Sequence, residues 1–291
     1  MKADEVRKVG VIGAGIMGSG IIEVIARSGQ DVVFVEISDE KVEEGRGKVE
    51  RSTARAVDKG KLAADDRDGI LGRITGGTDL RSLADVDLVI EAATEDLDIK
   101  LGVFQQLDDL TRDEVVLATN TSSLPIAELA AKTTRPDKVI GMHFFNPPPV
   151  LKLLEVIRGL QTSDETLDFA RAYGERIGKT TVLSKDRAGF IVNFLLVPYL
   201  NSAVQMLDDG VATKEDIDTA VHLGLAHPMG PLTLLDLIGL DTALYISNVL
   251  YDEFKDPLYA APTLLKRMVS AGLFGRKSGR GFYDYSSGEQ R

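Results

Sequence analysis

Short apolar runs rich in β-branched side chains alternate with longer amphipathic stretches over the first part of the chain. Such runs are typical of buried strands, and the stretches between them have the apolar spacing of helices. This alternation predicts an α/β fold, in which helices cover a doubly wound, mostly parallel sheet. Strands are expected at residues 8–12, 31–35, 87–93, 115–118, 139–142, 151–157 and 180–183.

The hydrophobic pattern changes after about Asp186. Residues 190–208 are apolar on nearly all faces of a helix, which indicates a helix that is deeply buried or shared with a partner subunit. Another helix is expected to open at residues 213–216, which have a capping-box signature. Further helices are expected at residues 232–250 and 262–271, with no strand pattern between 190 and 275. We therefore expect two domains: an α/β domain of residues 1–187 and an all-helical domain of residues 188–291.

Residues 39–61 form a charged segment within the first domain. Its apolar residues are sparse and lie at Val42, Val49 and Val57, so the segment is expected to be a long helix or helical hairpin that lies partly in solvent. Two interpretations are open. The segment is either a solubilising face or an arm that meets a ligand from outside.

Composition narrows the function classes. The 291-residue chain has a formal net charge of −11, which argues against nucleic acid or an anionic membrane as a partner. It contains no cysteine, so disulfides, thiol catalysis and cysteine-ligated metal are excluded, and no metal is expected. The start of the chain lacks the apolar region of a signal peptide, and no apolar run reaches the roughly 18 residues that span a bilayer. A cytoplasmic location is expected.

A glycine-rich turn follows the first predicted strand directly. It has the sequence Gly13-Ala14-Gly15-Ile16-Met17-Gly18. The first glycine permits a tight turn, the second lets a diphosphate approach the backbone, and the third lets the next helix pack on the sheet. Glu36 ends the second strand, where its carboxylate can accept both ribose hydroxyls of an adenosine. These features predict a Rossmann-type dinucleotide site; the alternative is a glycine-rich turn with a surface glutamate.

Three histidines are present, and one of them lies where ligands bind in such sheets. His143 follows an apolar strand at the carboxyl edge and precedes a rigid Asn-Pro-Pro-Pro segment. A neutral imidazole there can take a hydroxyl proton while hydride leaves the same carbon, because the ordinary pKa of imidazole lies near neutral pH. His222 lies in a helical pattern and His227 in a turn, so structural roles are expected for both.

Glu155 lies inside an apolar run that is expected to be a buried strand. A buried carboxylate is costly without a partner. Pairing with His143 would orient the imidazole and stabilise its protonated form. A salt bridge to Lys152 or Arg158 is the alternative, and spacing does not choose between the two.

Other polar residues also have two interpretations. Asn120 and Ser122 follow a predicted strand, where a hydroxyl can donate to a substrate carbonyl or developing alkoxide. The alternative is an Asx or Ser turn that caps the next helix. Asn193 lies inside an apolar helix, where an amide either makes a core hydrogen bond or contacts substrate.

Taken together, these motifs resemble the L-3-hydroxyacyl-CoA dehydrogenase family, especially its short bacterial members. The resemblance covers nearly the whole chain. The residues that carry it lie at 13–18, 91–96, 120–123, 143–147, 155–156, 189–193, 228–231, 239–241 and 277–283.

The resemblance implies roles for particular residues. His143 would be the general base and Glu155 the acid that holds it, while Ser122 and Asn193 would position the substrate oxygen. Cofactor contacts beside the glycine turn and Glu36 are implied for Glu95, Lys100, Asn120 and Asn146. Contacts with coenzyme A are implied for Ser52, Lys59, Ser122 and Lys277.

The resemblance also implies a reaction and its partners. The expected reaction interconverts an (S)-3-hydroxyacyl-CoA, with a short acyl chain as in 3-hydroxybutyryl-CoA, and the 3-ketoacyl-CoA. A homodimer formed through the helical domain is expected. The family often has Asp where this chain has Glu36; the longer acid still repels a 2′-phosphate, so NAD is expected. NADP remains an alternative if Arg46 or a nearby lysine compensates. A dehydrogenase of a free hydroxy acid or sugar acid and a non-catalytic, crystallin-like relative are the alternative functions.

Overall fold

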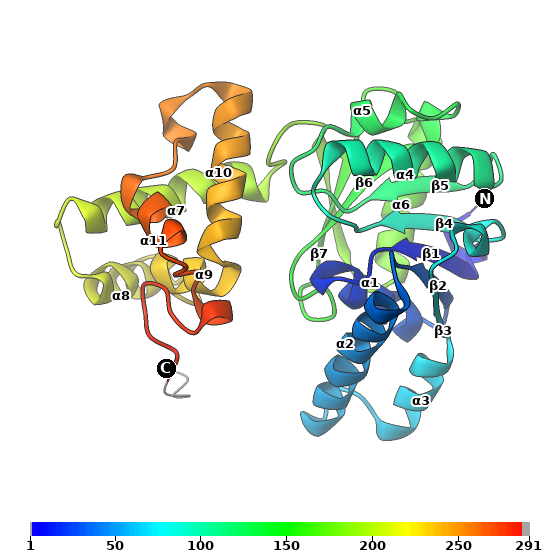
Figure 1. Cartoon of the computed structure of the whole chain (residues 1–291), viewed down its shortest axis with the longest axis horizontal. Coiled ribbons are helices and arrows are strands. Elements are labelled where there is room, and N and C mark those ends of the chain that lie inside the picture. The colour runs from blue at the N-terminus through cyan, green and yellow to red at the C-terminus, as the bar shows by residue number, and fades with distance from the viewer. Residues whose placement is uncertain (1, 287–291) are drawn as a thin grey trace. The chain divides into compact units, whose positions relative to one another are not determined.

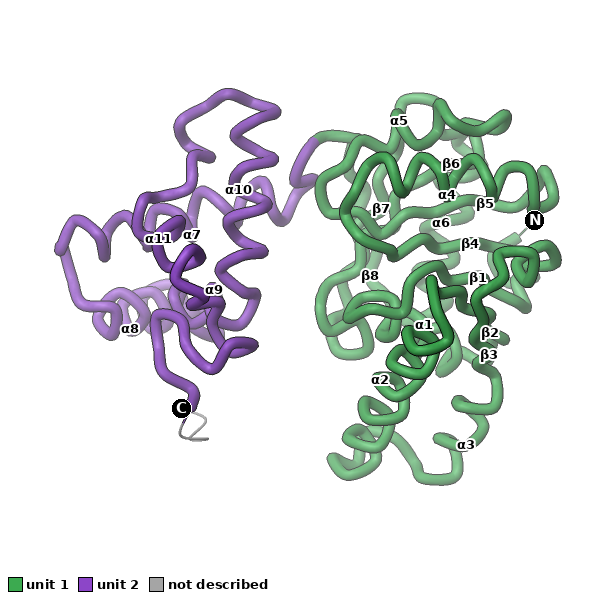
Figure 2. Tube along the Cα trace, in the orientation of Figure 1, with its two compact units in different colours: residues 1–187 green, residues 188–291 purple. Residues whose placement is uncertain are grey.

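The computed structural model describes residues 2–286, which belong to two compact units (Figures 1 and 2). The first unit comprises residues 1–187 and contains the sheet. The second comprises residues 188–291, and its regular elements are helices in the part that is described.

The first unit is built on an eight-stranded sheet with the order β3-β2-β1-β4-β5-β6-β7-β8. Neighbouring strands are parallel except β6 and β7, which are antiparallel, so the predicted α/β fold with a mostly parallel sheet is confirmed. The strands are β1 (Lys8–Ile12), β2 (Asp31–Val35), β3 (Ile74–Gly77), β4 (Leu88–Glu91), β5 (Val116–Thr119), β6 (Val139–Phe144), β7 (Leu153–Arg158) and β8 (Thr180–Lys185).

The edge strand β3 is not predicted by the hydrophobic pattern. It reads Ile-Thr-Gly-Gly and has one large apolar side chain. Gly76 pairs with Phe34 of β2, and a Cβ atom at Gly76 would lie 2.4 Å from the ring of Phe34. The strand therefore joins the sheet because a side chain is missing at this point.

Helices cover both faces of the sheet. α1 (Ile16–Arg27) and α6 (Asp164–Arg176) share a core with one face, and α4 (Leu97–Leu110) and α5 (Ile126–Ala130) lie over the other (Figure 1). Short 3₁₀ turns are formed by Ala3–Glu5, Leu80–Leu83 and Pro136–Lys138. The parallel connections bring the carboxyl ends of β1, β2, β4 and β5 to one edge, where ligands bind in this architecture.

The charged segment is a long helix, as expected, and it belongs to a hairpin that extends further along the chain. α2 (Asp39–Asp58) begins after Ser38, whose hydroxyl accepts a hydrogen bond from the Lys41 amide, and it packs against α3 (Ala64–Gly72) (Figure 1). Only three residues of α2 are buried: Gly45, Val49 and Thr53.

The second unit contains α7 (Val192–Asp208), α8 (Lys214–Gly224), α9 (Pro231–Ile238), α10 (Leu240–Phe254) and α11 (Thr263–Ser270), with 3₁₀ turns at Pro257–Tyr259 and Arg276–Ser278. The expectation of one helix over residues 232–250 is wrong, because α9 and α10 meet at an angle of 96°. Gly239 separates them with a φ of +103°, a conformation that ends a helix and that other residues rarely adopt. No single described helix is long and apolar enough to cross a membrane, although α9 and α10 together match one in length and composition.

α7 is buried on one side only. Val197, Leu200 and Val204 lie in cores of the unit, whereas the side chains of Leu195 and Met206 are 65% and 43% exposed. The interpretation of α7 as a deeply buried helix is therefore wrong. Apolar side chains of α7 also lie on its exposed side. The alternative, that α7 is shared with a partner subunit, stays a prediction.

The C-terminal segment is held against α9 by a buried acid. The carboxylate of Asp236 accepts hydrogen bonds from the amides of Phe282 and Tyr283, both at 2.9 Å, and from the hydroxyl of Tyr285 at 3.0 Å. Burial raises the pKa of Asp236, and burial likewise raises the pKa of Tyr285 to about 12. Asp218 accepts a further bond from the Tyr283 hydroxyl at 3.0 Å.

Candidate active site

The glycine turn between β1 and α1 leaves an open surface at the start of the helix. Gly13 has a φ of +84°, and a Cβ atom there would lie 2.8 Å from the Ala92 carbonyl oxygen. A Cβ atom at Gly18 would lie 1.9 Å from the Gly13 carbonyl oxygen, whereas one at Gly15 would have no atom within 4 Å. Gly13 and Gly18 are thus required by the fold, while Gly15 leaves room for a ligand. A diphosphate approaching the backbone at the N-terminus of α1 fits this space.

Glu36 lies at the end of β2 and supports this turn. Its Oε1 accepts a hydrogen bond of 2.6 Å from the Ala14 amide, and its Oε2 accepts one of 3.2 Å from the Ile37 amide. A carboxylate has about four acceptor positions, so capacity for ribose hydroxyls remains. Arg46 donates to the Ile74 carbonyl oxygen and pairs with Glu50, so its guanidinium has partners other than a 2′-phosphate. These contacts fit NAD.

His143 and Glu155 face each other across the antiparallel pair β6 and β7. They are direct register partners, and His143 Nδ1 lies 2.7 Å from Glu155 Oε2. His143 is 6% exposed and Glu155 is 0% exposed. A carboxylate accepts hydrogen bonds, so Nδ1 is the donor of this contact when Glu155 is a carboxylate, and a neutral ring would then have its lone pair on Nε2. The ring is therefore held in the tautomer that a general base needs.

The structure decides between the two interpretations of Glu155. Arg158 pairs with Asp164 at 2.7 Å, and Lys152 is exposed. The other two histidines lie in the helical unit, where His222 Nδ1 is 2.6 Å from the His227 carbonyl oxygen. This contact fits the structural roles expected for both.

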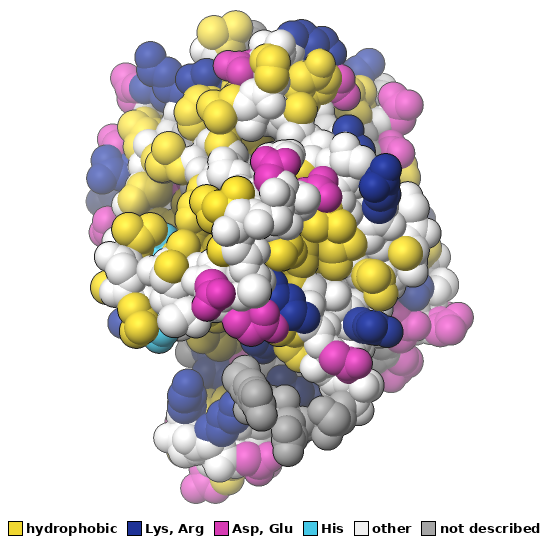
Figure 3. Space-filling model, turned by 90° about the vertical axis from the view of Figure 1, so that its left-hand side faces the viewer, with side chains coloured by type: hydrophobic (Ala, Val, Ile, Leu, Met, Phe, Trp, Pro, Cys, Tyr) yellow, Lys and Arg dark blue, Asp and Glu magenta, His cyan; other side chains and the backbone are white. Residues whose placement is uncertain are grey.

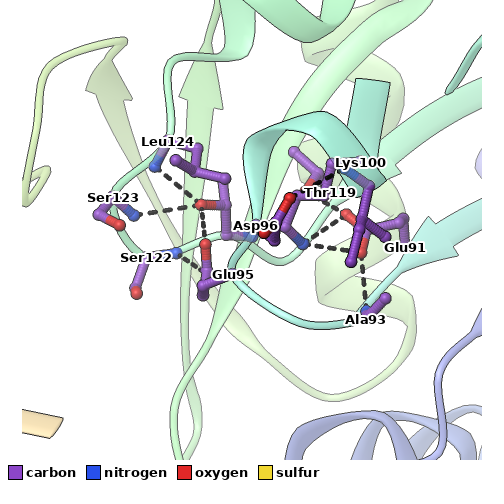
Figure 4. A network of polar contacts seen from close by, with 11 residues as sticks. Glu91, Ala93, Glu95, Asp96, Lys100, Thr119, Ser122, Ser123 and Leu124 are labelled. Atoms are coloured by element: carbon purple, nitrogen blue, oxygen red, sulfur yellow. Dashed lines mark hydrogen bonds and ion pairs between the residues drawn. The ribbon is translucent and has the colours of Figure 1, made fainter. Parts of the chain in front are cut away.

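Asn120 and its neighbours form the connection after β5. The Asn120 side-chain oxygen accepts a 2.8 Å hydrogen bond from the Phe144 amide, which ties the end of β5 to β6 beside His143. Thr121, rather than Asn120 or Ser122, makes the turn, since its hydroxyl oxygen accepts from the amides of Ser123 and Leu124. The Ser122 side chain is directed away from these contacts (Figure 4).

Glu95 and Lys100 are tied into a polar network in the same region (Figure 4). Glu95 accepts from the Thr121 hydroxyl at 2.8 Å and from the Ser122 amide at 3.0 Å. The Lys100 side chain is 1% exposed, and its ammonium lies 2.7 Å from both carboxylate oxygens of Glu91. Sequence reasoning missed Glu91 as a functional candidate, although an acid at the end of an apolar strand is the same signal that drew attention to Glu36.

The loop after β6 contains Asn146, which is exposed. The ammonium of Lys179 holds this loop by donating to the carbonyl oxygens of Pro148 and Leu151, and burial lowers the pKa of Lys179. Sequence reasoning also missed Lys179, because a single lysine before β8 has no distinguishing pattern.

The residues implied in coenzyme A binding lie in both units. Ser52 is half-buried on α2, and Lys59 is exposed at the end of that helix. In the helical unit, Lys277 pairs with Asp241 at 2.6 Å. Asn193, which the resemblance implies in positioning the substrate oxygen, is buried in the first turn of α7. Their roles remain predictions.

Comparison with known proteins agrees with this geometry. Residues 8–187 match the NAD binding domain of 3-hydroxyacyl-CoA dehydrogenase, and residues 189–285 match its C-terminal domain. A 3-hydroxybutyryl-CoA dehydrogenase of Mycobacterium tuberculosis is 50% identical over 97% of this chain and its own whole length. One from Clostridioides difficile is 48% identical over 96% of this chain and 99% of its own length.

Solved structures give the same result. The crystal structure of FadB2 from M. tuberculosis has a TM-score of 0.95 and 49% identity, and the match covers 96% of this chain and 99% of that one. The (S)-3-hydroxybutyryl-CoA dehydrogenase PaaH1 from Ralstonia eutropha has a TM-score of 0.91 and 47% identity, over 97% of this chain and 99% of that one. On these matches and on the site geometry, the chain belongs to the 3-hydroxyacyl-CoA dehydrogenase family.

Proposed function

We propose that this enzyme interconverts (S)-3-hydroxybutyryl-CoA and acetoacetyl-CoA with NAD and NADH. The observation that carries the proposal is the buried pair of His143 and Glu155, whose Nδ1–Oε2 distance is 2.7 Å, at the edge of a dinucleotide-binding sheet. The relatives named above support the four-carbon acyl chain.

His143 is the general base of the proposed reaction. In the oxidising direction, its Nε2 takes the proton of the C3 hydroxyl, and in the reducing direction it returns that proton. NAD, which the glycine turn and Glu36 would hold, would supply the hydride acceptor for C3. The Glu155 carboxylate stabilises the imidazolium that forms and keeps the ring from turning.

Ser122 and Asn193 are proposed to hold the substrate oxygen. The backbone amide of Ser122 donates a hydrogen bond to Glu95, which fixes the backbone at this point. The Ser122 side chain does not take part in this contact and is proposed to meet a ligand. A hydroxyl or amide donor aimed at this oxygen stabilises the negative charge that develops on it. Asn193, buried in the first turn of α7, is the proposed contribution of the helical unit.

Coenzyme A is proposed to contact the α2 arm. Lys59 is exposed at the end of α2, and Ser52 lies two turns earlier on the same helix. On a chain with a net charge of −11, a local cation is needed to attract an anionic ligand. Lys277 is proposed to be the corresponding cation of the helical unit.

We also propose a cytoplasmic homodimer that forms through the helical unit, without a membrane or nucleic-acid partner. Figure 3 shows several patches of hydrophobic side chains on one face of the molecule. In the helical unit, large exposed apolar side chains include Leu195, Met206, Val211, Leu223 and Leu225. Burial of such side chains against a second copy would be favourable. Light scattering during size-exclusion chromatography tests this, and a purely monomeric chain at micromolar concentration would contradict it.

A single assay tests the proposed reaction. NADH oxidation is followed by absorbance with acetoacetyl-CoA, and NADPH and free acetoacetate serve as comparisons. We expect turnover with acetoacetyl-CoA and NADH, and a fall in kcat of about 10²-fold or more in His143→Gln with NADH affinity nearly unchanged. Near-normal turnover in that variant would refute the role of His143.

A further inference from the structure

A buried carboxylate at the end of β4 gathers four hydrogen bonds from three elements. Glu91 is 0% exposed, and Lys100 of α4 donates to both of its oxygens at 2.7 Å. The Ala93 amide donates to Oε1 at 2.7 Å, and the Thr119 hydroxyl at the end of β5 donates to Oε2 at 2.7 Å. Glu91 therefore joins the start of one loop to the end of the neighbouring strand.

The network continues from Thr119 into the next loop and returns. The Thr119 hydroxyl oxygen accepts from the Thr121 amide at 3.3 Å, and the Thr121 hydroxyl donates to Glu95 at 2.8 Å. Glu95 also accepts from the Ser122 amide at 3.0 Å. The contacts in Figure 4 thus form a closed circuit between residues 91–96 and residues 119–124.

This circuit borders the glycine turn. The Ala92 amide donates to the Ile12 carbonyl oxygen at 2.8 Å, and a Cβ atom at Gly13 would lie 2.8 Å from the Ala92 carbonyl oxygen. Any shift of residues 92 and 93 would therefore move the surface next to the turn. The same shift would move Glu95 and, through it, the backbone of Ser122.

A pair of buried charges is a costly way to gain stability, since well-packed apolar residues often stabilise a protein as much. The pair contributes positioning here. The two Glu91 oxygens accept four hydrogen bonds, and these fix the positions of the segments that carry the donors. The Lys100 side chain is only 1% exposed, and Glu91 accepts two hydrogen bonds from its ammonium, so the pair acts as one unit in this geometry.

We propose that Glu91 and Lys100 are positioning residues, which hold the loops after β4 and β5 in the arrangement that binds NADH. The inference rests on the proposed site at these loops. Lys100 acts through Glu91, and Glu91 acts through the Ala93 amide and the Thr119 hydroxyl. We call Glu91 and Lys100, with their contacts to the Ala93 amide and the Thr119 hydroxyl, the clamp. Loss of the clamp raises the Kd for NADH, since binding must then order the loops.

The test uses the full-length enzyme and the double variant Glu91→Gln with Lys100→Met, which leaves no buried charge unpaired. We expect its melting temperature to recover most of what the single variant Lys100→Met loses. The Kd for NADH, measured by fluorescence, is expected to stay about tenfold above that of the wild type. At saturating NADH, kcat is expected to fall less than the NADH affinity.

A neutral pair of variants tests the same circuit without changing charge. Thr119→Val removes the hydroxyl that links Glu91 to Thr121, and Thr119→Ser keeps it. Weakened NADH binding is expected in the valine variant, with recovery in the serine variant.

The opposite end of α4 offers a matched control. Arg135 and Asp108 form another buried ion pair, at 3.2 Å, where Arg135 also donates to Leu107 and Thr111 carbonyl oxygens near the end of the helix. Arg135→Met is expected to lower the melting temperature and leave the Kd for NADH unchanged.

Two outcomes would overturn the inference. One is that NADH affinity follows melting temperature through all variants, Arg135→Met included, which would make the pair merely structural. The other is normal NADH affinity in the folded double variant. If the double variant binds NADH poorly and His143→Gln binds it normally, the clamp is supported. A wild-type enzyme that binds NADH but does not turn over acetoacetyl-CoA would refute the proposed reaction without affecting the clamp.

Discussion

His143 and Glu155 are direct partners across two antiparallel strands, in a sheet whose other neighbouring strands are parallel. Cross-strand partners on the same face bring their side chains together, so the 2.7 Å contact is a consequence of register. A shift of one residue in the register of β7 would turn Glu155 to the opposite face. The antiparallel pair thus makes the geometry of the proposed general base a property of the backbone.

The first prediction concerns the charge of Glu155. Glu155→Gln keeps an acceptor for the Nδ1 proton but removes the negative charge that stabilises the imidazolium. We expect kcat to fall about 10²-fold with little change in the Kd for NADH. Steady-state kinetics together with NADH fluorescence titration measure both quantities. A variant with wild-type kcat would contradict the role of the charge.

The second prediction separates two glycines of the same turn. Gly15→Ala places a methyl group where no protein atom lies within 4 Å, so the fold should tolerate it while the diphosphate loses its space. Gly18→Ala places one 1.9 Å from the Gly13 carbonyl oxygen. We expect Gly15→Ala to weaken NADH binding about tenfold or more with little change in melting temperature, and Gly18→Ala to lower the melting temperature markedly. Equal melting temperatures in the two variants would contradict this account.

The third prediction concerns the α2 arm. Lys59→Ala should raise the KM for acetoacetyl-CoA several-fold at low salt, and the effect should shrink as salt increases because the contact is exposed. The KM for NADH should not change. Lys132→Ala, which removes another exposed lysine from the loop after α5, is the matched control. An unchanged KM for acetoacetyl-CoA in Lys59→Ala would favour a substrate without coenzyme A.

The fourth prediction concerns pH and Asp236. Burial raises its pKa in the folded chain above the unfolded value, so the folded state binds the proton more tightly. The contribution of Asp236 to stability therefore becomes less favourable as the pH rises from the ordinary pKa of an aspartate through the raised pKa that Asp236 has in the folded chain. The side chain introduced by Asp236→Asn does not titrate, so the melting temperature of the wild type minus that of the variant should decrease over this interval. A difference that grows with pH there would contradict the prediction.

Loss of the amide contacts is a separate effect in the same variant. The asparagine side chain of Asp236→Asn would keep one acceptor oxygen for the amides of Phe282 and Tyr283, so at neutral pH we expect a loss of about 1–3 kcal/mol in the free energy of unfolding. Urea denaturation at neutral pH measures it.

Local pattern was sufficient for the parts of the fold that depend on residues close in the chain. The strand before Gly13 and the acid at Glu36 lie within one strand-helix-strand unit, so their spacing carries the information about the turn. β3 and the bend at Gly239 were missed for one reason. In each case a glycine allows the arrangement, since Gly76 lets β3 lie against Phe34 and Gly239 has a φ of +103°.

Residue types and their order along the chain were enough to indicate the α/β class and the glycine turn, because each follows from periodicity or from short spacings. The family was indicated by a resemblance that rests on motifs along nearly the whole chain. The partner of Glu155, the source of the turn after β5 and the burial of Lys100 against Glu91 required the folded chain. These contacts join residues from different strands and loops, and the register and twist of the sheet bring them within hydrogen-bonding distance. Many side chains along the chain could serve as partners, and cross-strand geometry selects among them.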